Sequence, residues 1–562
     1  MKVPRILFIV MAINLCLNVY GNNWGLPSRL YADEKVTNVL HMLNKRTLVD
    51  VYDNYTHPTG YQLLLSFYMI PFFGYMKLVD YPVGAIREAA STSWMHLAKL
   101  FPDFAINVYT YARTLSALLG AFTVYLIFLL GKKIYNEKVG LFSAIFLSLT
   151  LGFVGVNHFA KYISFVNFLI VLSLLFCVRR SFYWAAFFSG LAASVQLNAF
   201  LLLLPLSLVL FLNHRNFKNF ISAVIISSLF YAGGFIVGTP TILSNFSGYA
   251  PMFKSILFGN IPALSHQRLP FFVGPLNYFF ELLTIYGIFI FAFIICGICL
   301  TLYHWKRITK DEAIVLVFVF AYYVIVTVLF EDKYPQTKHI IAIVPPLTLL
   351  GGKFFYAVFK NRLSNPIKYG FLLIALLYSF AYTFKGDLVL KKEDTRYIST
   401  KWIYAEIPKG AKIETFNQIH FICLDKVFDD YEFIYLGRNS KSFKGKNFFN
   451  WVEVENKEEY LDYINRYDSD ADFIMISLDY MEELYLRDVS ESHLPGLVQY
   501  MRDLFDGRKN FRLVKIFTSG NQRLASKRID GFYYPESVLW NPVPSAGTVS
   551  PTIYVFEKIK KG

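Results

Sequence analysis

The stretch from Val108 to Gly131 reads VYTYARTLSALLGAFTVYLIFLLG, and Lys132 and Lys133 follow it directly. An α-helix needs about 20 mainly apolar residues to cross the hydrocarbon core of a bilayer. This stretch is long enough and carries a single charge, Arg113. Similar stretches recur from the N-terminus to about residue 384. The sequence therefore predicts a polytopic α-helical membrane protein.

The apolar stretches together predict about eleven transmembrane helices. The first is Met1–Tyr20, where Lys2 and Arg5 precede an apolar run. No small-residue cleavage pattern follows it, so we expect a retained helix with a cytoplasmic N-terminus. Further spans are expected near residues 139–157, 162–178, 183–197, 198–213, 217–237, 278–303, 313–330, 339–359 and 368–384.

The short loops between these stretches fall into two sets. One set is strongly basic and is cytoplasmic by the positive-inside rule. It contains Lys132, Lys133, Lys138, Arg179, Arg180, Arg215, Lys218, Lys306, Arg307, Lys310, Lys360, Arg362 and Lys368. All of these fall on one side only if Tyr61–Val79, which contains Pro71 and Gly74, lies along the outer interface instead of crossing. The remaining loops and the tail are then extracytoplasmic.

Composition divides the chain into two domains. The whole chain is 55% hydrophobic and 17% charged, against about a quarter charged in a soluble globular protein. Charge returns from about residue 385, so we expect a transmembrane domain over 1–384, with an outer loop at 21–107, and a soluble extracytoplasmic domain over 385–562. The net charge of +15 does not indicate a nucleic-acid partner, because much of the excess lies in short loops beside the spans.

The tail predicts a small α/β domain, because strand and helix patterns alternate along it. Asp394–Gly410 predicts an amphipathic helix ended by Pro408 and Gly410. Strands are expected at Lys412–Phe416, Asp472–Ile476 and Arg512–Phe517, and helices at Glu458–Tyr467 and Pro495–Phe505. This domain either shapes the acceptor side of a site or is a structural cap.

Asp33 and Glu34 follow the first span, in the first outer loop. Carboxylates there are either a solvated surface pair or include a general base, which must be held near the hydroxyl that it deprotonates. The pair alone does not decide between these interpretations.

Cations lie at the outer ends of later spans, where the positive-inside rule does not account for them. Arg113 lies one turn into its apolar helix and Lys161 begins a later one, while Lys333, Lys338 and His339 lie at the mouth of another. They would either bind lipid headgroups non-specifically or hold the phosphate of a lipid-linked donor, whose leaving group gains negative charge.

Uncharged polar residues accompany these cations on the same side. His158 and Tyr162 flank Lys161 and are candidate contacts for an acceptor or a sugar. Gln196 and Asn198 interrupt a long apolar run, where they would either bond to neighbouring backbone or contact a sugar.

Six segments, taken in order, resemble the C-type glycosyltransferase (GT-C) superfamily, in particular its protein O-mannosyltransferase and lipid A aminoarabinose transferase group. They are Leu30–Lys35 (LYADEK), Thr56–Tyr61 (THPTGY), Tyr111–Gly120 (YARTLSALLG), Ala160–Ile163 (AKYI), Gly238–Pro240 (GTP) and Lys338–Pro345 (KHIIAIVP). Lys161 stands where that group carries an arginine. Ser164–Asn167 (SFVN) lacks the aspartate that the mannosyltransferases have there, which leaves the acceptor open.

The resemblance implies an inverting transfer of a sugar from a polyprenyl-phosphate donor to an extracytoplasmic lipid, glycan or protein. Asp33 would be the base that deprotonates the acceptor hydroxyl, and Glu34 would orient or assist it. Arg113, Lys161 and Lys338 would hold the departing lipid phosphate, and His57 would lie close to the site.

No metal or other cofactor is expected, because the first outer loop has no Asp-x-Asp motif and the five cysteines lack zinc-ligand spacing. The main alternative function is a polytopic transporter or lipid flippase, but no internal repeat is evident. The second is a membrane scaffold with a sensing domain, which would not require an acidic pair and three cationic clusters on one side.

Overall fold

A computed structural model describes residues 4–26, 34–45, 59–79, 82, 86, 97–98, 100–214, 216–250, 273–329, 337–360, 365–416, 430–437, 447–450, 462, 464–465, 469–477, 496–517, 527–529, 532–534 and 553–559. The chain forms two compact units. The first holds the described residues up to Leu388 except Val273, and the second holds those from Val389 onward. The regular secondary structure that is described in the first unit is helical, and the described strands belong to the second.

The described helices of the first unit follow one another along the chain. They are α1 (Arg5–Val19), α2 (Val36–Lys45), α3 (Gly60–Leu78), α6 (Pro102–Ile134), α7 (Glu137–Ser148), α8 (Leu151–Asn157), α9 (Tyr162–Val178), α10 (Phe182–Ala193), η1 (Leu197–Leu202), α11 (Leu203–Asn213), α12 (Phe217–Gly238), η2 (Pro240–Ile242), α14 (Val273–Tyr286), α15 (Ile288–Tyr303), η3 (Trp305–Arg307), α16 (Lys310–Val324), η4 (Ile325–Leu329), α17 (Thr337–Ile340), η5 (Ile341–Ile343), α18 (Val344–Lys360) and α19 (Asn365–Leu388). The predicted span at 162–178 coincides with α9.

Five helices in the described part of the chain are long and apolar enough to cross a membrane, namely Pro102–Ile134, Phe217–Gly238, Lys310–Val328, Lys338–Lys360 and Pro366–Glu406. α7 and α8 pass the same test together, although they bend by 63° between them. Shorter apolar helices are α1, α9, α10, α15 and the run from η1 to α11. The prediction of a multi-pass helical membrane protein is confirmed. The count of about eleven spans stays a prediction, because these shorter helices fall below the usual spanning length.

Two predicted spans are broken. The expected span at 278–303 is two helices, α14 and α15, separated by Gly287 at φ +70°. Glycine adopts this left-handed conformation without a steric penalty, and it ends α14 inside an unbroken apolar run. The span at 139–157 is the bent pair α7 and α8. A hydropathy profile averages apolar character over many residues, so a change of backbone direction within an apolar stretch does not alter it.

α3 contains the segment that was predicted to lie along the outer interface. It is helical despite Pro71 and buries Tyr61, Leu65 and Met69, which are spaced four residues apart on one face. This face packs against α2 and α6. α3 is not among the helices that are long and apolar enough to span a membrane, and its interfacial position stays a prediction.

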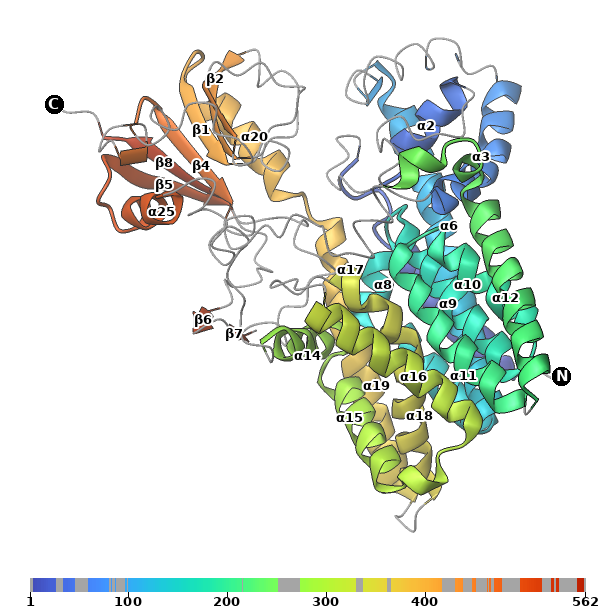
Figure 1. The fold of residues 1–562 in the computed structure, drawn as a ribbon. Helices are drawn as coiled ribbons and strands as arrows, with labels where there is room; N and C mark the ends of the chain where they lie inside the picture. The colour runs from blue at the N-terminus through green and yellow to red at the C-terminus, as the bar shows by residue number, and fades with distance from the viewer. Residues whose placement is uncertain are drawn as a thin grey trace. The chain divides into compact units, whose positions relative to one another are not determined.

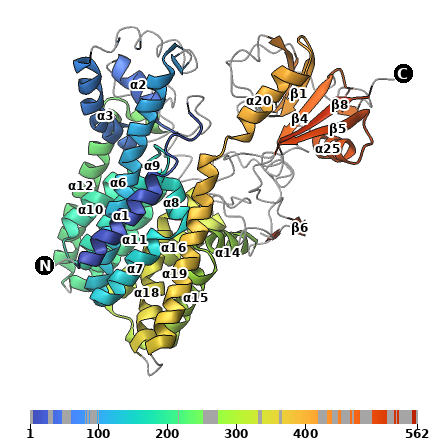
Figure 2. The ribbon, with the colours of Figure 1, turned by 180° about the vertical axis from the view of Figure 1, so that it is seen from behind.

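Small residues allow the helices of the bundle to approach closely. Figure 1 shows α9, α10, α11 and α12 side by side, and Figure 2 shows α1 along α6 and α7. A Cβ added to Gly234 of α12 would lie 2.0 Å from the carbonyl oxygen of Phe187 in α10, and one added to Gly190 would lie 1.9 Å from that of Tyr231. Close backbone contact of this kind favours helix association in lipid, where apolar burial gives little driving force.

Gly234→Ala is therefore expected to destabilise the first unit by about 1–3 kcal/mol, because its methyl group must push α10 and α12 apart. The neighbouring Gly233→Ala is the matched control, since a Cβ there meets nothing within 4 Å. Thermal unfolding of both purified variants in detergent checks this. Equal unfolding temperatures for the two variants would show that the α10–α12 contact does not depend on glycine.

The second unit is an α/β domain, as predicted. Its six-stranded sheet has the order β3-β2-β1-β4-β8-β5, in which β3, β2, β1 and β4 are parallel and β8 is antiparallel to both of its neighbours. Figure 1 shows this sheet with α20 and α25. The elements are α20 (Thr395–Glu406), β1 (Lys412–Phe416), β2 (Glu432–Gly437), β3 (Asn447–Asn450), β4 (Phe473–Ser477), α25 (Leu497–Phe505), β5 (Phe511–Phe517), β6 (Lys527–Ile529), β7 (Phe532–Tyr534) and β8 (Ile553–Lys558).

Five of these elements match the predictions from the tail sequence. α20 begins after Asp394, whose side chain accepts a hydrogen bond from the Arg396 amide. The predicted strands are β1, β4 and β5, and the second predicted helix is α25. The helix expected at 458–467 lies mostly outside the described residues. The extracytoplasmic side of this unit stays a prediction.

Candidate active site

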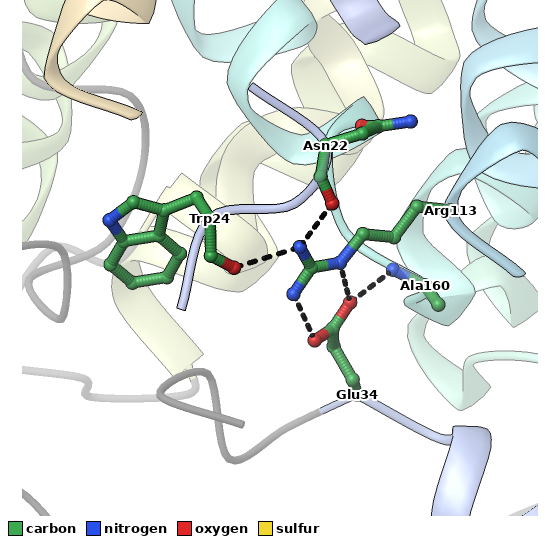
Figure 3. Close-up of polar contacts among 5 residues, drawn as sticks. All are labelled: Asn22, Trp24, Glu34, Arg113 and Ala160. Atoms are coloured by element: carbon green, nitrogen blue, oxygen red, sulfur yellow. Dashed lines mark hydrogen bonds and ion pairs between the residues drawn. The ribbon is translucent and has the colours of Figure 1, made fainter. Parts of the chain in front are cut away.

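Glu34 and Arg113 form a buried ion pair in the first unit (Figure 3). Glu34 lies two residues before the start of α2, and Arg113 lies in α6. The Arg113 Nε donates to Glu34 Oε1 at 2.8 Å and its Nη2 donates to Oε2 at 2.7 Å. The two side chains are 0% and 1% exposed. A two-point contact of this kind fixes both the position and the orientation of the carboxylate.

The rest of the Arg113 guanidinium is also engaged. Its Nη1 donates to the carbonyl oxygens of Asn22 at 2.6 Å and Trp24 at 2.9 Å, as Figure 3 shows. Its Cζ lies 5.5 Å from the centre of the Phe159 ring. Arg113 therefore ties the chain around Asn22 and Trp24, and Glu34 beyond it, to α6. Its predicted contact with a lipid phosphate stays a prediction.

Glu34 also contacts the chain between α8 and α9. The Ala160 amide donates to Glu34 Oε1 at 2.9 Å, and the Lys35 amide donates to the Ala160 carbonyl oxygen at 3.1 Å. We call residues Asn157–Lys161 the bridging segment. Its two hydrogen bonds to Glu34 and Lys35 are both made by Ala160, so Glu34 lies next to the residue that precedes Lys161.

Lys161 is the N-cap residue of α9, with an extended backbone at φ −116°. Lys161 is 2% exposed, and lysine is seldom so fully buried unless it is paired. The structure thus brings together three of the predicted site residues, Glu34, Arg113 and Lys161, along the bridging segment.

His158, at the other end of the bridging segment, pairs with a carboxylate that the sequence analysis missed. Its Nε2 lies 3.0 Å from Asp387 Oδ1, and the two side chains are 1% and 0% exposed. Asp387 lies in the last turn of α19. The sequence does show a carboxylate at the end of the last apolar run, but it does not indicate that His158 would be its partner.

Three other predicted residues gather around Tyr322 of α16, a second residue that sequence analysis missed. The Tyr322 hydroxyl donates to the His339 carbonyl oxygen at 3.1 Å, and the side chains of Asn198 and Tyr162 lie near it. Tyr322 is buried within an apolar helix. A tyrosine in an apolar helix is usually part of the hydrophobic core, so the sequence did not indicate that its hydroxyl would contact predicted site residues.

The remaining predicted residues are placed less centrally or not described. Lys338 is half-buried in α17, beside His339. Gln196 is the N-cap residue of η1 and is partly exposed. Asp33, His57 and Lys333 lie outside the described residues. Among the residues that are described, no three His, Cys, Asp or Glu side chains gather as metal ligands, and the expectation of metal independence stays a prediction.

Sequence comparison gives no relative for this chain. No model of a known protein family matches it, and no curated protein matches it.

Structural comparison finds similar solved structures. The oligosaccharyltransferase of Archaeoglobus fulgidus in its apo form matches with a TM-score of 0.52 and 12% identity, over 98% of this chain and 88% of that one. ArnT from Cupriavidus metallidurans, bound to undecaprenyl phosphate, matches with a TM-score of 0.46 and 10% identity, over 85% and 94% of the two chains. The archaeal oligosaccharyltransferase AglB from Archaeoglobus fulgidus, in complex with an inhibitory peptide and a dolichol-phosphate, matches with a TM-score of 0.47 and 11% identity. The match covers 99% of this chain and 88% of that one. Scores below 0.5 are too low to establish a common fold, whereas the apo oligosaccharyltransferase does share the fold of this chain. The chain therefore has the fold of this oligosaccharyltransferase, which agrees with the fold that the sequence resemblance predicted.

Proposed function

We propose that this chain is a membrane glycosyltransferase that moves a sugar, with inversion, from a polyprenyl-phosphate donor to an extracytoplasmic lipid, glycan or protein. One observation carries the proposal. The backbone of the bridging segment is hydrogen-bonded to both Glu34 and Lys35. A base that activates the acceptor and a cation that holds the donor phosphate must both lie close to the anomeric carbon. The hydrogen bonds of Ala160 to Glu34 and Lys35 support the presence of the acidic pair and Lys161 in one site. The shared fold with an oligosaccharyltransferase supports the reaction class.

Asp33, which precedes Glu34 in the chain, is the base in this proposal. Its carboxylate takes the proton of the acceptor hydroxyl, the hydroxyl oxygen attacks the anomeric carbon, and the bond from that carbon to the phosphate oxygen breaks. Attack from the face opposite the phosphate inverts the anomeric centre. The released polyprenyl phosphate takes the electron pair of the broken bond. The Glu34–Arg113 pair supports this step by fixing the chain immediately after Asp33.

Lys161 is the cation best situated to stabilise the leaving phosphate, because it adjoins Ala160, which is bonded to Glu34. A cation held in a buried site is more effective there than in water, since it need not reorganise as charge develops. Lys338 and His339 would extend the phosphate site from α17. We further propose that the N-terminus is cytoplasmic and that the second unit is extracytoplasmic.

Lys161→Met is expected to slow sugar transfer by roughly 10²-fold, the scale on which loss of one preorganised electrostatic contact acts. Lys161→Arg keeps the charge and should retain most of the activity. Lys133→Met, which removes an exposed cation at the predicted cytoplasmic end of α6, is the control.

The experiment measures transfer of labelled sugar from a panel of polyprenyl-phosphate sugars by the purified full-length chain, with native membrane extract as the source of acceptor. A folded Lys161→Met variant with wild-type rate would remove Lys161 from the phosphate site. Movement of the intact donor across the membrane, with its sugar still attached, would favour a flippase instead.

A further inference from the structure

The His158–Asp387 pair has no part in the chemistry proposed above, yet both of its members are buried in the first unit. Burial of a carboxylate costs free energy unless hydrogen bonds or an opposite charge compensate it. Asp387 Oδ1 has His158 Nε2 at 3.0 Å, but Asp387 Oδ2 and His158 Nδ1 have no hydrogen-bond partner among the described residues. The contact between the two side chains is therefore the main compensation for each of them.

The bridging segment depends on contacts of this kind for its position. Residues 158–161 form a turn and bends between α8 and α9, without the continuous hydrogen bonds of a helix. At one end His158 contacts Asp387 of α19, and at the other Ala160 is bonded to Glu34. Between them the Phe159 ring meets the edge of Trp24, with ring centres 5.8 Å apart. Side-chain contacts to three other parts of the chain thus fix where α9 begins.

We propose that Asp387 and His158 are positioning residues for the phosphate site. Their contact anchors the first part of the bridging segment to α19, so that Ala160 stays bonded to Glu34 and Lys161 stays at the start of α9. This inference rests on the proposed function, because it assumes that Lys161 holds a lipid phosphate. Neither residue touches the reacting atoms. Their effect passes through the two residues that separate His158 from Lys161.

The test uses the full-length chain in detergent and geranylgeranyl phosphate as the probe of the phosphate site. Asp387→Ala and His158→Ala are expected to weaken its binding roughly tenfold or more, by analogy with the loss of a contact that orients a metal ligand. His158→Gln should restore most of the affinity, because its side-chain N–H can still donate to the Asp387 carboxylate.

Thr383→Val is the matched control. Thr383 lies one turn before Asp387 in α19, and its hydroxyl donates to the Leu149 carbonyl oxygen at 2.7 Å, so the variant also breaks a buried contact of α19. It should leave binding of the probe unchanged. Hydrogen–deuterium exchange adds a local measurement. The Ala160 amide should exchange faster in Asp387→Ala than in wild type or in Thr383→Val.

The outcomes distinguish a failure of the proposed phosphate site from a failure of the positioning role of His158 and Asp387. Wild-type chain that does not bind the probe contradicts the proposed phosphate site itself. Wild-type binding that survives unchanged in folded His158→Ala and Asp387→Ala contradicts the positioning role alone, whatever the exchange rate. If the alanine variants do not fold, Asp387→Asn, which removes only the charge, carries the same comparison. Equal loss in Thr383→Val would also contradict the proposal, because it would show a general loss of stability.

Discussion

Asp33→Asn is expected to lower the rate of sugar transfer by about 10²–10⁴-fold while the chain keeps its fold. The carboxamide has nearly the shape of the carboxylate but does not accept the proton of the acceptor hydroxyl. The oxygen must then attack without general-base assistance. Glu34 does not replace it, because both of its carboxylate oxygens are engaged by Arg113 and by the Ala160 amide.

The measurement compares initial rates of transfer for wild type and Asp33→Asn with the same donor, at matched amounts of folded protein. Asp103→Asn is the control, since Asp103 is an exposed carboxylate in the first turn of α6. That variant should transfer sugar at the wild-type rate. Full activity in Asp33→Asn would remove Asp33 from the role of base.

Breaking the Glu34–Arg113 pair is expected to be the most destabilising change, at about 3–5 kcal/mol for Glu34→Gln or Arg113→Met. Each single replacement leaves one buried group without its partner. The loss should be smaller for the double replacement, because no uncompensated charge remains. Arg113→Lys should not rescue the pair, since an ammonium group does not reproduce the two parallel hydrogen bonds of a guanidinium.

Thermal and denaturant unfolding of the two single variants and the double variant give the coupling between the residues. Glu137→Gln is the matched control. It breaks the Lys132–Glu137 pair, in which Glu137 is 51% exposed, and exposed pairs contribute roughly 1 kcal/mol or less. Additive effects of the two single replacements would contradict a clamp formed by Glu34 and Arg113.

The apolar helices of the first unit were predictable from hydropathy, because a bilayer restricts spanning segments to long apolar helices. The places where prediction failed are breaks inside apolar runs. The left-handed Gly287 and the bend between α7 and α8 leave the composition of the run unchanged, so they are invisible to its average.

The candidate site was predicted as a set of residues but not as a set of contacts. Glu34 and Arg113 were expected in separate roles, as a helper of the base and as a phosphate ligand, and the structure pairs them. The two residues are 79 positions apart in the chain, so a pattern in the local sequence cannot predict their contact. Asp387 and Tyr322 were missed for the same reason, because their importance comes only from the residues that pack against them.

The central claim is tested most directly by mass-spectrometric detection of free polyprenyl phosphate released from a polyprenyl-phosphate sugar by the purified chain in the presence of acceptor. The account predicts that at least one donor in the panel is consumed, that its sugar appears on the acceptor with inverted anomeric configuration, and that Asp33→Asn slows both by about 10²-fold or more. A folded wild-type chain that consumes no donor, or an Asp33→Asn variant that releases polyprenyl phosphate at the wild-type rate, would contradict it.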